Sequence, residues 1–596
     1  MNNHHGEYDH IFQTKIDSWV PINRAVHDFF TQREIDALKR SERTFTCANR
    51  TVVFLSFENQ FASLGGLAAV AHHLPLWLQK LSEKVLFFTP LHSKNTNTQD
   101  ALRCGKLVPV FTKKILRICN YQGVLSCYEH VDAPYKSYFL EVDGRFYAGD
   151  NPYAYEDKTE LLIDSLAFSA AVPFVLAQLG VTSNLIFHAH DWETAPIAIT
   201  SKLAVISNLI NSARTLLTLH NSFDSGIALR HKTLFFGKNI PGETILQCTI
   251  PLLNGPLTTV STPFAHELRH DPLQKGIFTD HLQKVFSMNP PIGVENGMFG
   301  EPVSPFSRDA INKAVRGETD DLLNEKAELR NRLLGEIKTI KTDPRVRGSL
   351  SITGRNSKTP VFFMSGRLDF MQKGFDVIFN AFVKLTRGSA KLFFCPSSSH
   401  TDSKELAFFE KIAERCEGDI IIVPFRLSRD QYNVFLQGAS YLLMPSFYEP
   451  FGAATEGMMN GTPVVARGTG GLWIQVNPHD GMYVPSFYGL MLDLDKRSEF
   501  PTGFLYREDY PDGAALRNWR EVIDLEPSKR VKNPLYTAMV DSAFNALKMA
   551  ITAFGTKKYY GQMVCNGLDS VNQFTWQRAV EKYQKIYDAA CYRGSL

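Results

Sequence analysis

Two glutamates and a group of glycines stand out in residues 445–472, PSFYEPFGAATEGMMNGTPVVARGTGGL. Glu449 and Glu456 lie between two short apolar runs, so we expect them near the ends of buried strands. A carboxylate in such a place can accept hydrogen bonds from two neighbouring hydroxyls of a sugar. The stretch is therefore typical of a site that binds hydroxyls and phosphates. For Glu456 the alternative interpretation is an ordinary glutamate on a surface helix.

Two cations follow another apolar run. Arg367 comes directly after PVFFMSG, and Lys373 follows in RLDFMQKGFD near the expected start of a helix. Two positive charges at the end of a strand can neutralise a diphosphate that gains charge as it leaves. Two solvated surface charges are the alternative, and the pair alone does not decide between them.

Glycine pairs precede two expected helices, one in each half of the chain. A helix that begins with glycines offers open N–H groups and the positive end of its dipole to a phosphate or a sugar oxygen. A single pair is usually an ordinary tight turn, but a pair in each half favours binding. The residues are Glu58, Gly65 and Gly66 after TVVFLSF, and Thr469, Gly470 and Gly471 after VVA.

Histidines close two further apolar runs. His188 and His190 precede Asp191 in FHAHDWETA, and TLLTLHNSFDSG contains His220 and Asn221. The H-x-H spacing can begin a metal site, but no further ligands follow at metal-site spacing, so we predict no metal. A structural histidine is the alternative for His220. Neither a G-x-S-x-G elbow nor a Walker A sequence occurs, which argues against serine hydrolases and P-loop NTPases.

Short apolar runs must position these residues. Runs rich in Val, Ile, Leu and Phe alternate with helical patterns such as GFDVIFNAFVKLT, which predicts parallel sheets covered on both faces. Ligands of such sheets bind beyond the carboxyl ends of the strands. The predicted strands are 51–57, 84–90, 184–190, 214–220, 360–366, 391–396, 419–425, 440–445 and 462–466.

The predicted strands form two clusters, separated by a polar stretch around 304–358. That stretch holds an expected exposed amphipathic helix in 317–337 and the loop-like RGSLSITGRNSKTP. The predicted fold class is therefore α/β, with two doubly wound, Rossmann-like domains that face a central cleft. The expected parts are an N-terminal extension (1–50), a first domain (51–303), a second domain (304–565) with an insertion at about 489–535, and a C-terminal helix (566–596) packing back on the first domain.

Composition narrows the function classes. The 596 residues include 64 Lys plus Arg against 61 Asp plus Glu, a net charge of +3, which gives little support to a nucleic-acid or membrane-surface role. Nine scattered cysteines without a C-x-x-C pair indicate a reducing, cytoplasmic setting. The polar start MNNHHGEYDH lacks a signal peptide's apolar core. The apolar stretch LAFSAAVPFVLAQLGV is broken by Pro173 and Gln178, so we expect a soluble protein without a membrane span.

Taken in chain order, the motifs resemble those of the retaining GT-B glycosyltransferases, closest to bacterial glycogen synthases and plant starch synthases. The resemblance runs from about residue 53 to 587. It rests on these segments, each similar to a family motif: GGLAAVAHHLP, YAGDNPYAYEDKTELLIDSLAFSAAV, HAHDWETA, TLHNSFDSG, TTVSTPFAHEL, GRLDFMQKG, PSFYEPFGAATEGMMNGTPVVARGTGGL and FTWQRAVEKYQKIY.

The resemblance implies an enzyme that transfers a hexose from a nucleotide sugar, ADP-glucose or UDP-glucose, to an acceptor such as an α-1,4-glucan. It implies front-face attack with the diphosphate taking the proton, no cofactor and no metal. The first domain would bind the acceptor and the second the donor. The implied catalytic residues are His220, Arg367, Lys373 and Glu449; the implied donor-binding residues are Gly65, Gly66, Glu456, Thr469, Gly470 and Gly471; and Glu58, Asp191 and Asn221 would contact the acceptor or the sugar.

The chain departs from the family pattern at several points. Ser63 stands where the family's K-T-G-G-L loop has its lysine, and Glu449 and Glu456 are one residue closer than in relatives with both. The tyrosine of the family's Y-Q-G turn is replaced around Asp224-Ser225-Gly226. These changes leave the donor nucleotide, the sugar, the acceptor and the oligomeric state open.

Two alternatives therefore stay beside the glucan synthase. One keeps the chemistry but modifies a protein or a small molecule. The other is a non-catalytic relative that binds a glucan or a partner protein. A phosphorylase would need a pyridoxal-phosphate lysine, and no motif for one is found.

Overall fold

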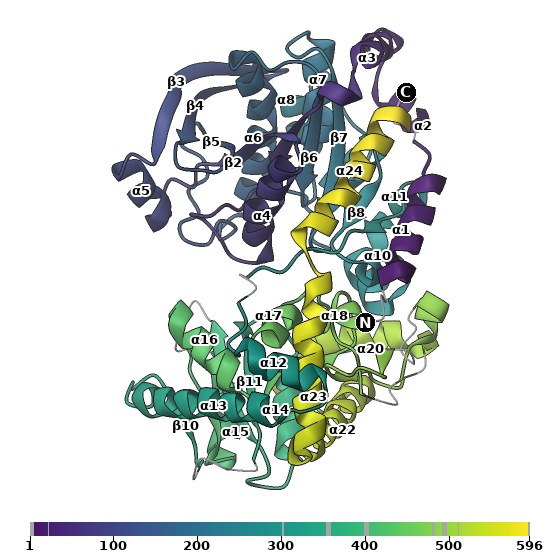
Figure 1. The fold of residues 1–596 in the computed structure, drawn as a ribbon. Helices are drawn as coiled ribbons and strands as arrows, with labels where there is room; N and C mark the ends of the chain where they lie inside the picture. Colours follow the sequence, from purple (N-terminus) through teal and green to yellow (C-terminus); the bar gives the residue numbers. More distant parts are fainter. Residues whose placement is uncertain are drawn as a thin grey trace. The chain divides into compact units, whose positions relative to one another are not determined.

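The computed structural model describes residues 5–21, 23–300, 303–352, 359–397, 404–479, 483–491, 497–510 and 512–593. The chain divides into two compact units (Figure 1). The first unit comprises Met1–Arg269, Phe278–Phe299 and Thr575–Leu596, and the second comprises His270–Ile277 and Gly300–Phe574. Each unit is built around one sheet.

The sheet of the first unit has nine described strands in the order β3-β4-β5-β2-β1-β6-β7-β8-β9. Strands β5 to β9 in this order are parallel, and β3, β4 and β5 form an antiparallel meander at one edge. The strands are β1 (Thr51–Leu55), β2 (Lys84–Pro90), β3 (Leu107–Ile118), β4 (Tyr121–His130), β5 (Lys136–Val142), β6 (Leu185–His190), β7 (Ala213–Leu219), β8 (Leu257–Thr259) and β9 (Ile292–Gly293).

Helices cover both faces of this sheet. Strand β1 is apolar throughout because its side chains are buried on both faces. Val52 and Phe54 pack into one buried cluster, whereas Val53 and Leu55 pack into another on the opposite face. Helices α4 and α24 lie side by side on the first face (Figure 1). The helices are α1 (His5–Ser18), α2 (Asn23–Phe29), α3 (Gln32–Thr44), α4 (Gly66–Lys80), α5 (Thr96–Arg103), α6 (Lys158–Gln178), α7 (Ile197–Ile206), α8 (Leu229–Phe236), α9 (Ile245–Thr249), α10 (Thr262–His270), α11 (Gln283–Met288) and α24 (Trp576–Arg593).

Helix α6 is the one helix in the described residues that is long and apolar enough to cross a membrane. However, 72% of its apolar window is buried inside the fold, where α6 packs against α7, α8 and the sheet. A core helix enclosed by protein is apolar all round for that reason. The stretch around Pro173, which the sequence suggested was not a span, is therefore part of the core of the first unit.

The sheet of the second unit has seven described strands in the order β10-β13-β12-β11-β14-β15-β16. All neighbouring pairs are parallel except β10 with β13. The strands are β10 (Arg347–Leu350), β11 (Val361–Arg367), β12 (Lys391–Ser397), β13 (Asp419–Ile422), β14 (Tyr441–Met444), β15 (Val464–Arg467) and β16 (Gly503–Tyr506). Two sheets of mainly parallel strands with flanking helices confirm the predicted α/β class.

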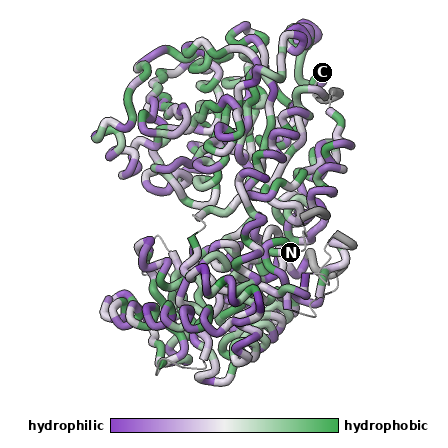
Figure 2. Tube along the Cα trace, viewed as in Figure 1, coloured by the Kyte–Doolittle hydropathy of each residue, from purple (hydrophilic) through white to green (hydrophobic). Residues whose placement is uncertain are grey.

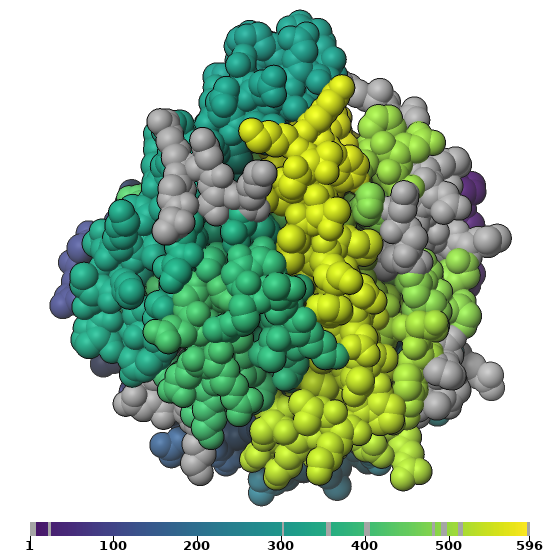
Figure 3. Space-filling model, turned by 90° about the horizontal axis from the view of Figure 1, so that it is seen from below, coloured from purple at the N-terminus to yellow at the C-terminus, as the bar shows by residue number. Residues whose placement is uncertain are grey.

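Consecutive residues of β11 again point to opposite faces. Phe362 stacks on Tyr441, whose hydroxyl donates to the Ala550 carbonyl of α22, whereas Phe363 packs near Phe435 of α16. Helices α22 and α23 run as one strip across the face in Figure 3. The helices are α12 (Arg308–Val315), α13 (Asp320–Ile340), α14 (Phe375–Val383), α15 (Lys404–Arg415), α16 (Arg429–Gly438), α17 (Ala454–Met459), α18 (Leu472–Gln475), α20 (Asp512–Asp524), α21 (Pro527–Arg530), α22 (Pro534–Gly555) and α23 (Lys557–Ser570).

The polar stretch around 304–358 differs from the sequence prediction in two ways. Helix α13 exists and is largely hydrophilic (Figure 2), but it is not simply exposed, because Lys326 is buried and donates to the Gln437 carbonyl and the Thr462 hydroxyl at 2.6 and 2.8 Å. The stretch 347–360 is not all loop, since Arg347–Leu350 pairs with β13. Residues 353–358 of that stretch lie outside the described residues.

The segment expected as an insertion, about 489–535, supplies a strand of the sheet. Gly503–Tyr506 forms β16 and pairs in parallel with β15. Gly503 suits this place because a side chain there would collide with the backbone of Val464. The second unit thus uses part of this segment as core.

Candidate active site

In the first unit, the predicted polar residues follow three neighbouring strands. Glu58 comes after β1, Asp191 after β6, and His220 with Asn221 after β7. Strands β1, β6 and β7 are adjacent and parallel, so their carboxyl ends meet at one edge of the sheet. The structure therefore brings these four residues to one place.

Asp191 organises that edge. Its carboxylate accepts a hydrogen bond from the His220 backbone N–H at 2.6 Å and from the Asn221 side-chain amide at 3.0 Å. Asp191 has a positive φ of 62°, which an aspartate tolerates better than most residues. Burial raises the pKa of Asp191 to about 7. The carboxyl group thus holds two loop residues and titrates near neutral pH.

Glu58 is occupied by the glycine loop. Its Oε2 accepts from the backbone N–H groups of Leu64 and Gly65 at 2.8 and 3.1 Å, and its Oε1 accepts from the Tyr153 hydroxyl at 3.1 Å. Gly65 and Gly66 are exposed at the start of α4, where the first N–H groups of a helix have no partner within the helix, and the Gly65 N–H is taken by Glu58. Glu58 is therefore better placed to shape this loop than to bind a sugar directly.

Three residues of this edge were not among the predicted site residues, although the sequence marks His190 as part of an H-x-H pair. Tyr153 lies in the quoted GDNPYAYED stretch, which could have singled it out. Glu193 is buried, its Oε2 has no hydrogen-bond partner, and burial together with the Asp191 charge raises its pKa. His190 Nδ1 lies 2.8 Å from His220 Nε2. His188, in contrast, bonds to Thr218 and to Tyr587 of α24, at 2.8 and 3.0 Å.

In the second unit, the predicted residues also follow three adjacent parallel strands, β11, β14 and β15. Arg367 ends β11, and its Nη2 donates to Gln372 Oε1 at 3.0 Å. Lys373 Nζ forms an ion pair with Glu449 Oε2 at 2.8 Å. The Ser446 hydroxyl donates to the same oxygen at 2.8 Å. A carboxylate and a cation are thus held together beside a second cation.

The glycine turn after β15 packs directly on Glu449. Gly470 has a positive φ of 48°, and a Cβ there would collide with the Glu449 carbonyl oxygen. The Gly471 N–H donates to that same oxygen at 3.0 Å. Thr469, which precedes the turn, is buried, and its carbonyl accepts from Leu472 N at 3.1 Å. The predicted donor-binding turn and the predicted catalytic glutamate therefore form one rigid element.

Glu456 stands apart from this group. It lies on α17, and in the described residues its carboxylate forms no ion pair with Arg367 or Lys373. Burial raises its pKa to about 7. Unlike Lys373 and Gly471, Glu456 forms no hydrogen bond or ion pair with Glu449 within the part of the chain that the structure describes.

Buried arginines form hydrogen bonds to the Glu449 loop and to the glycine turn of the second unit. These arginines were not identified from the sequence. Arg467 pairs with Glu508 and donates to the Phe447 carbonyl at 2.6 Å, and Arg507 donates to the Gly468 carbonyl at 2.7 Å and pairs with Asp271 at 3.0 Å. These bonds hold the Glu449 loop and the glycine turn.

A further buried arginine holds the Lys373 loop. Arg530 pairs with Asp376 at 3.1 Å and donates to the Phe370 carbonyl at 3.1 Å. Arg507, Glu508 and Arg530 all come from the segment that the sequence suggested was an insertion, and no local pattern marks them.

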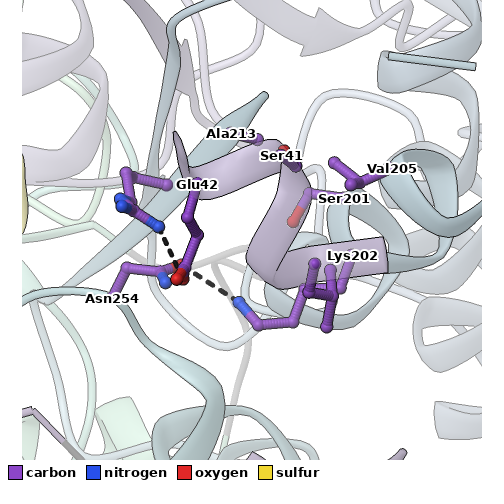
Figure 4. Close-up of a pocket in the computed structure, with 9 residues that line it drawn as sticks. Ser41, Glu42, Ser201, Lys202, Val205, Ala213 and Asn254 are labelled. Carbon is purple, nitrogen blue, oxygen red and sulfur yellow. Dashed lines mark hydrogen bonds and ion pairs between the residues drawn. The ribbon is translucent and has the colours of Figure 1, made fainter. Parts of the chain in front are cut away.

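Two further observations bear on where a ligand could bind in the described residues. No group of three or more His, Cys, Asp or Glu with metal-binding geometry occurs in the part of the chain that the structure describes. A cavity of about 20 Å³ in the first unit has room for little more than a water molecule (Figure 4). None of the predicted site residues lines it; its lining is Leu38, Ser41, Glu42, Ser201, Lys202, Val205, Ala213, Arg214 and Asn254.

Both units contain a range that matches a known protein family. Residues 51–251 match the family described as the starch synthase catalytic domain, and residues 349–486 match glycosyl transferases group 1. These two ranges contain every predicted site residue. The glycogen synthase of Alkaliphilus metalliredigens is 24% identical over 560 residues, covering 90% of this chain and 99% of that protein.

Two further similarities extend the comparison. The glycogen synthase of Pseudothermotoga lettingae is 27% identical over 447 residues, 70% of this chain and 83% of its own length. The solved catalytic domain of starch synthase IV from Arabidopsis thaliana, bound to ADP and acarbose, shares the fold with a TM-score of 0.67 at 18% identity, covering 91% of this chain and all of that one. Residues 51–251 and 349–486 thus match glycosyltransferase families, the fold is GT-B, and the chain is similar to the glycogen and starch synthases, as the sequence motifs predicted.

Proposed function

We propose that this protein is a retaining hexosyltransferase that transfers glucose from a nucleotide sugar, ADP-glucose or UDP-glucose, to an α-1,4-glucan. The observation that carries the proposal is the arrangement of Lys373, Glu449 and the turn at Gly470 and Gly471, with Arg367 beside it. The second unit is the donor side in this proposal, and the first unit is the acceptor side.

The donor side supplies charge to the leaving group. Arg367 and Lys373 stabilise the diphosphate as the bond to the sugar breaks. Glu449 Oε2 is taken by Lys373 and Ser446, and in the described residues Oε1 has no hydrogen-bond partner. Oε1 therefore accepts hydrogen bonds from hydroxyls of the donor sugar. Thr469, Gly470 and Gly471 contribute backbone contacts, and Glu456 adds a second carboxyl group to the donor side.

The acceptor side supplies hydrogen bonds to hydroxyls. His220 contacts the sugar near its reacting carbon, and Asp191 and Asn221 keep the His220 loop in place. Glu58 holds the loop of Gly65 and Gly66. The acceptor hydroxyl attacks from the face that the diphosphate leaves, the bond from the sugar to the diphosphate breaks, and the diphosphate takes the hydroxyl proton, so configuration is retained.

The first test is nucleotide release by the purified protein from ADP-glucose, UDP-glucose and GDP-mannose, each with and without glycogen. Release from a glucose donor that rises with glycogen supports the proposal and identifies the nucleotide. Slow release that ignores glycogen points to a protein or small-molecule acceptor. No release from any donor, by protein that is folded by circular dichroism, overturns the catalytic proposal and favours a non-catalytic binding protein.

A further inference from the structure

His190 has an unusual hydrogen-bonding state for a buried histidine. Its ring is fully buried on β6 and stacks on Phe54 with the ring centroids 4.1 Å apart. In the described residues, its one ring hydrogen bond joins Nδ1 to His220 Nε2, 2.8 Å away. Its other nitrogen, Nε2, is buried with no partner. The position of the single ring proton therefore matters.

Both rings are neutral. Burial lowers the pKa of His220 to about 3 and that of His190 well below its ordinary value, and His188 on the same strand adds to the effect on His190. A neutral imidazole carries one N–H and one lone pair. Across the 2.8 Å contact, either His190 Nδ1–H donates to His220, or His220 Nε2–H donates to His190.

The two arrangements differ in what they leave at His190 Nε2. If His220 donates, the proton of His190 sits on Nε2, where a buried N–H has no acceptor. If His190 donates, Nε2 instead carries a lone pair that is buried without a donor. Orphaned buried N–H groups are rarer than under-satisfied acceptors, because an N–H that loses water without a partner forfeits its full hydrogen bond. The second arrangement is favoured.

We propose that His190 is a positioning residue: its Nδ1–H donates to His220 Nε2 and fixes His220 in the tautomer that carries its proton on Nδ1. The His220 backbone N–H is held at the same time by Asp191, so main chain and ring are both fixed. His220 then presents an N–H donor to a ligand oxygen and has no free lone pair with which to accept a proton.

The consequence for the reaction rests on the proposed function. His220 hydrogen-bonds an oxygen of the transferred sugar but does not deprotonate the acceptor. That leaves the departing diphosphate as the group that takes the acceptor proton.

The test combines a spectrum with a pair of variants. In protein labelled with ¹⁵N in the histidine rings, His220 is assigned by the signals lost in His220→Asn. We expect a protonated Nδ1 and an unprotonated Nε2 in the ligand-free wild type. A protonated Nε2 would overturn the proposal. This readout needs no substrate, so it stands or fails separately from the proposed function.

His190→Phe keeps an aromatic ring against Phe54 but removes the donor, and His190→Gln keeps an amide donor. We expect His190→Phe to lose the fixed Nδ1–H pattern and to be about 10-fold less active in kcat/KM than His190→Gln, a ratio typical of one hydrogen bond. His188→Phe is the control, since His188 bonds to Thr218 and Tyr587 and not to His220; it should leave the His220 spectrum unchanged. An unchanged His220 spectrum in His190→Phe would contradict the proposal, and if neither His190 variant folds, the wild-type spectrum decides.

Discussion

The candidate site residues of both units follow the carboxyl ends of adjacent parallel strands, but the charges of the two groups of residues differ. At the edge of the first unit, four buried groups are kept neutral or close to it: His188, His190 and His220 have lowered pKa values, and the pKa of Asp191 is raised to about 7. At the edge of the second unit, charges are kept and paired, as in Lys373 with Glu449 at 2.8 Å.

The difference follows from what surrounds each group. At the first edge burial is the largest cause of the pKa shifts, so charge is penalised there and neutral hydrogen-bonding groups persist. At the second edge, arginines from distant segments pair with the buried carboxylates Asp271, Asp376 and Glu508, and Lys373 pairs with Glu449. A neutral edge suits hydroxyls and a charged edge suits a diphosphate, which is the division that the proposed reaction requires.

The largest expected effect tests the charged edge directly. Arg367→Ala removes a cation that we assign to the leaving diphosphate, and kcat should fall by about 10²–10³-fold. The melting temperature should stay close to that of the wild type, because Arg367 is only partly buried. Arg517→Ala is the matched control, since Arg517 is 90% exposed in the same unit. Near-full activity of Arg367→Ala would show that the charged edge is not the donor site.

The next effect tests whether the arginines from distant segments hold that edge together. Arg530→Met leaves Asp376 buried without its charge partner, and the free energy of unfolding should fall by about 3–5 kcal/mol. Adding Asp376→Asn removes the unpaired charge and should restore part of the loss. Urea unfolding measures both variants. If the double variant is no more stable than Arg530→Met, the pair is not the reason for the loss.

A smaller effect tests whether Glu456, although it lies in the second unit, is kept protonated by burial like the groups at the edge of the first unit. With its pKa raised to about 7, folded Glu456 keeps a proton that the unfolded chain releases near pH 4. Since the folded state binds more protons in this window, Glu456 makes the fold less stable as pH rises from about 4 to 7.

Glu456→Gln cannot ionise, so its free energy of unfolding should match that of the wild type near pH 4 and exceed it by about 1–3 kcal/mol at pH 8. Urea unfolding of both proteins at a series of pH values measures the difference, in which other titrating groups cancel. A difference that does not change with pH would mean that Glu456 is charged throughout.

The smallest effect concerns the departure at Ser63. Its side chain is exposed, so Ser63→Lys should change stability by less than about 0.5 kcal/mol. An added cation near the donor should lower the donor KM by about two- to five-fold, the strength of an exposed ion pair. Ser63→Gln has a long neutral side chain and should leave KM unchanged. Equal KM values for both variants would show that the side chain at position 63 does not contact the bound donor.

The sequence revealed nine of the parallel strands and the polar residues that follow several of them, because a fully buried strand is an unbroken apolar run and the polar residue after it stands out. It did not reveal the short parallel strands β8 and β9. Nor did it reveal β3 and β4, where exposed polar residues interrupt the apolar pattern, or β5, which begins with the exposed Lys136. It also missed β16, a strand of four residues in a segment that otherwise looks polar.

The missed site residues share one cause, which is that their partners are distant in the chain. Arg507 holds Gly468 and Asp271, and Arg530 holds Phe370. His190 meets His220 because the register of β6 and β7 places His190 opposite Thr218, two residues before His220. Spacing along a sequence does not encode such contacts; the sheet register and the packing of loops create them.

The contacts of α24 bear on the order in which the protein is made. Tyr587 and Tyr583 of α24 reach His188 and Thr218 in the middle of the first sheet, at 3.0 and 3.4 Å. During synthesis, α24 is made only after Gly300–Phe574, which belong to the second unit. Until then this polar face of the first sheet lacks α24, while the second unit can already fold. The domain that begins first is therefore completed last, and a chain stopped before Trp576 leaves the His188 network without its tyrosines.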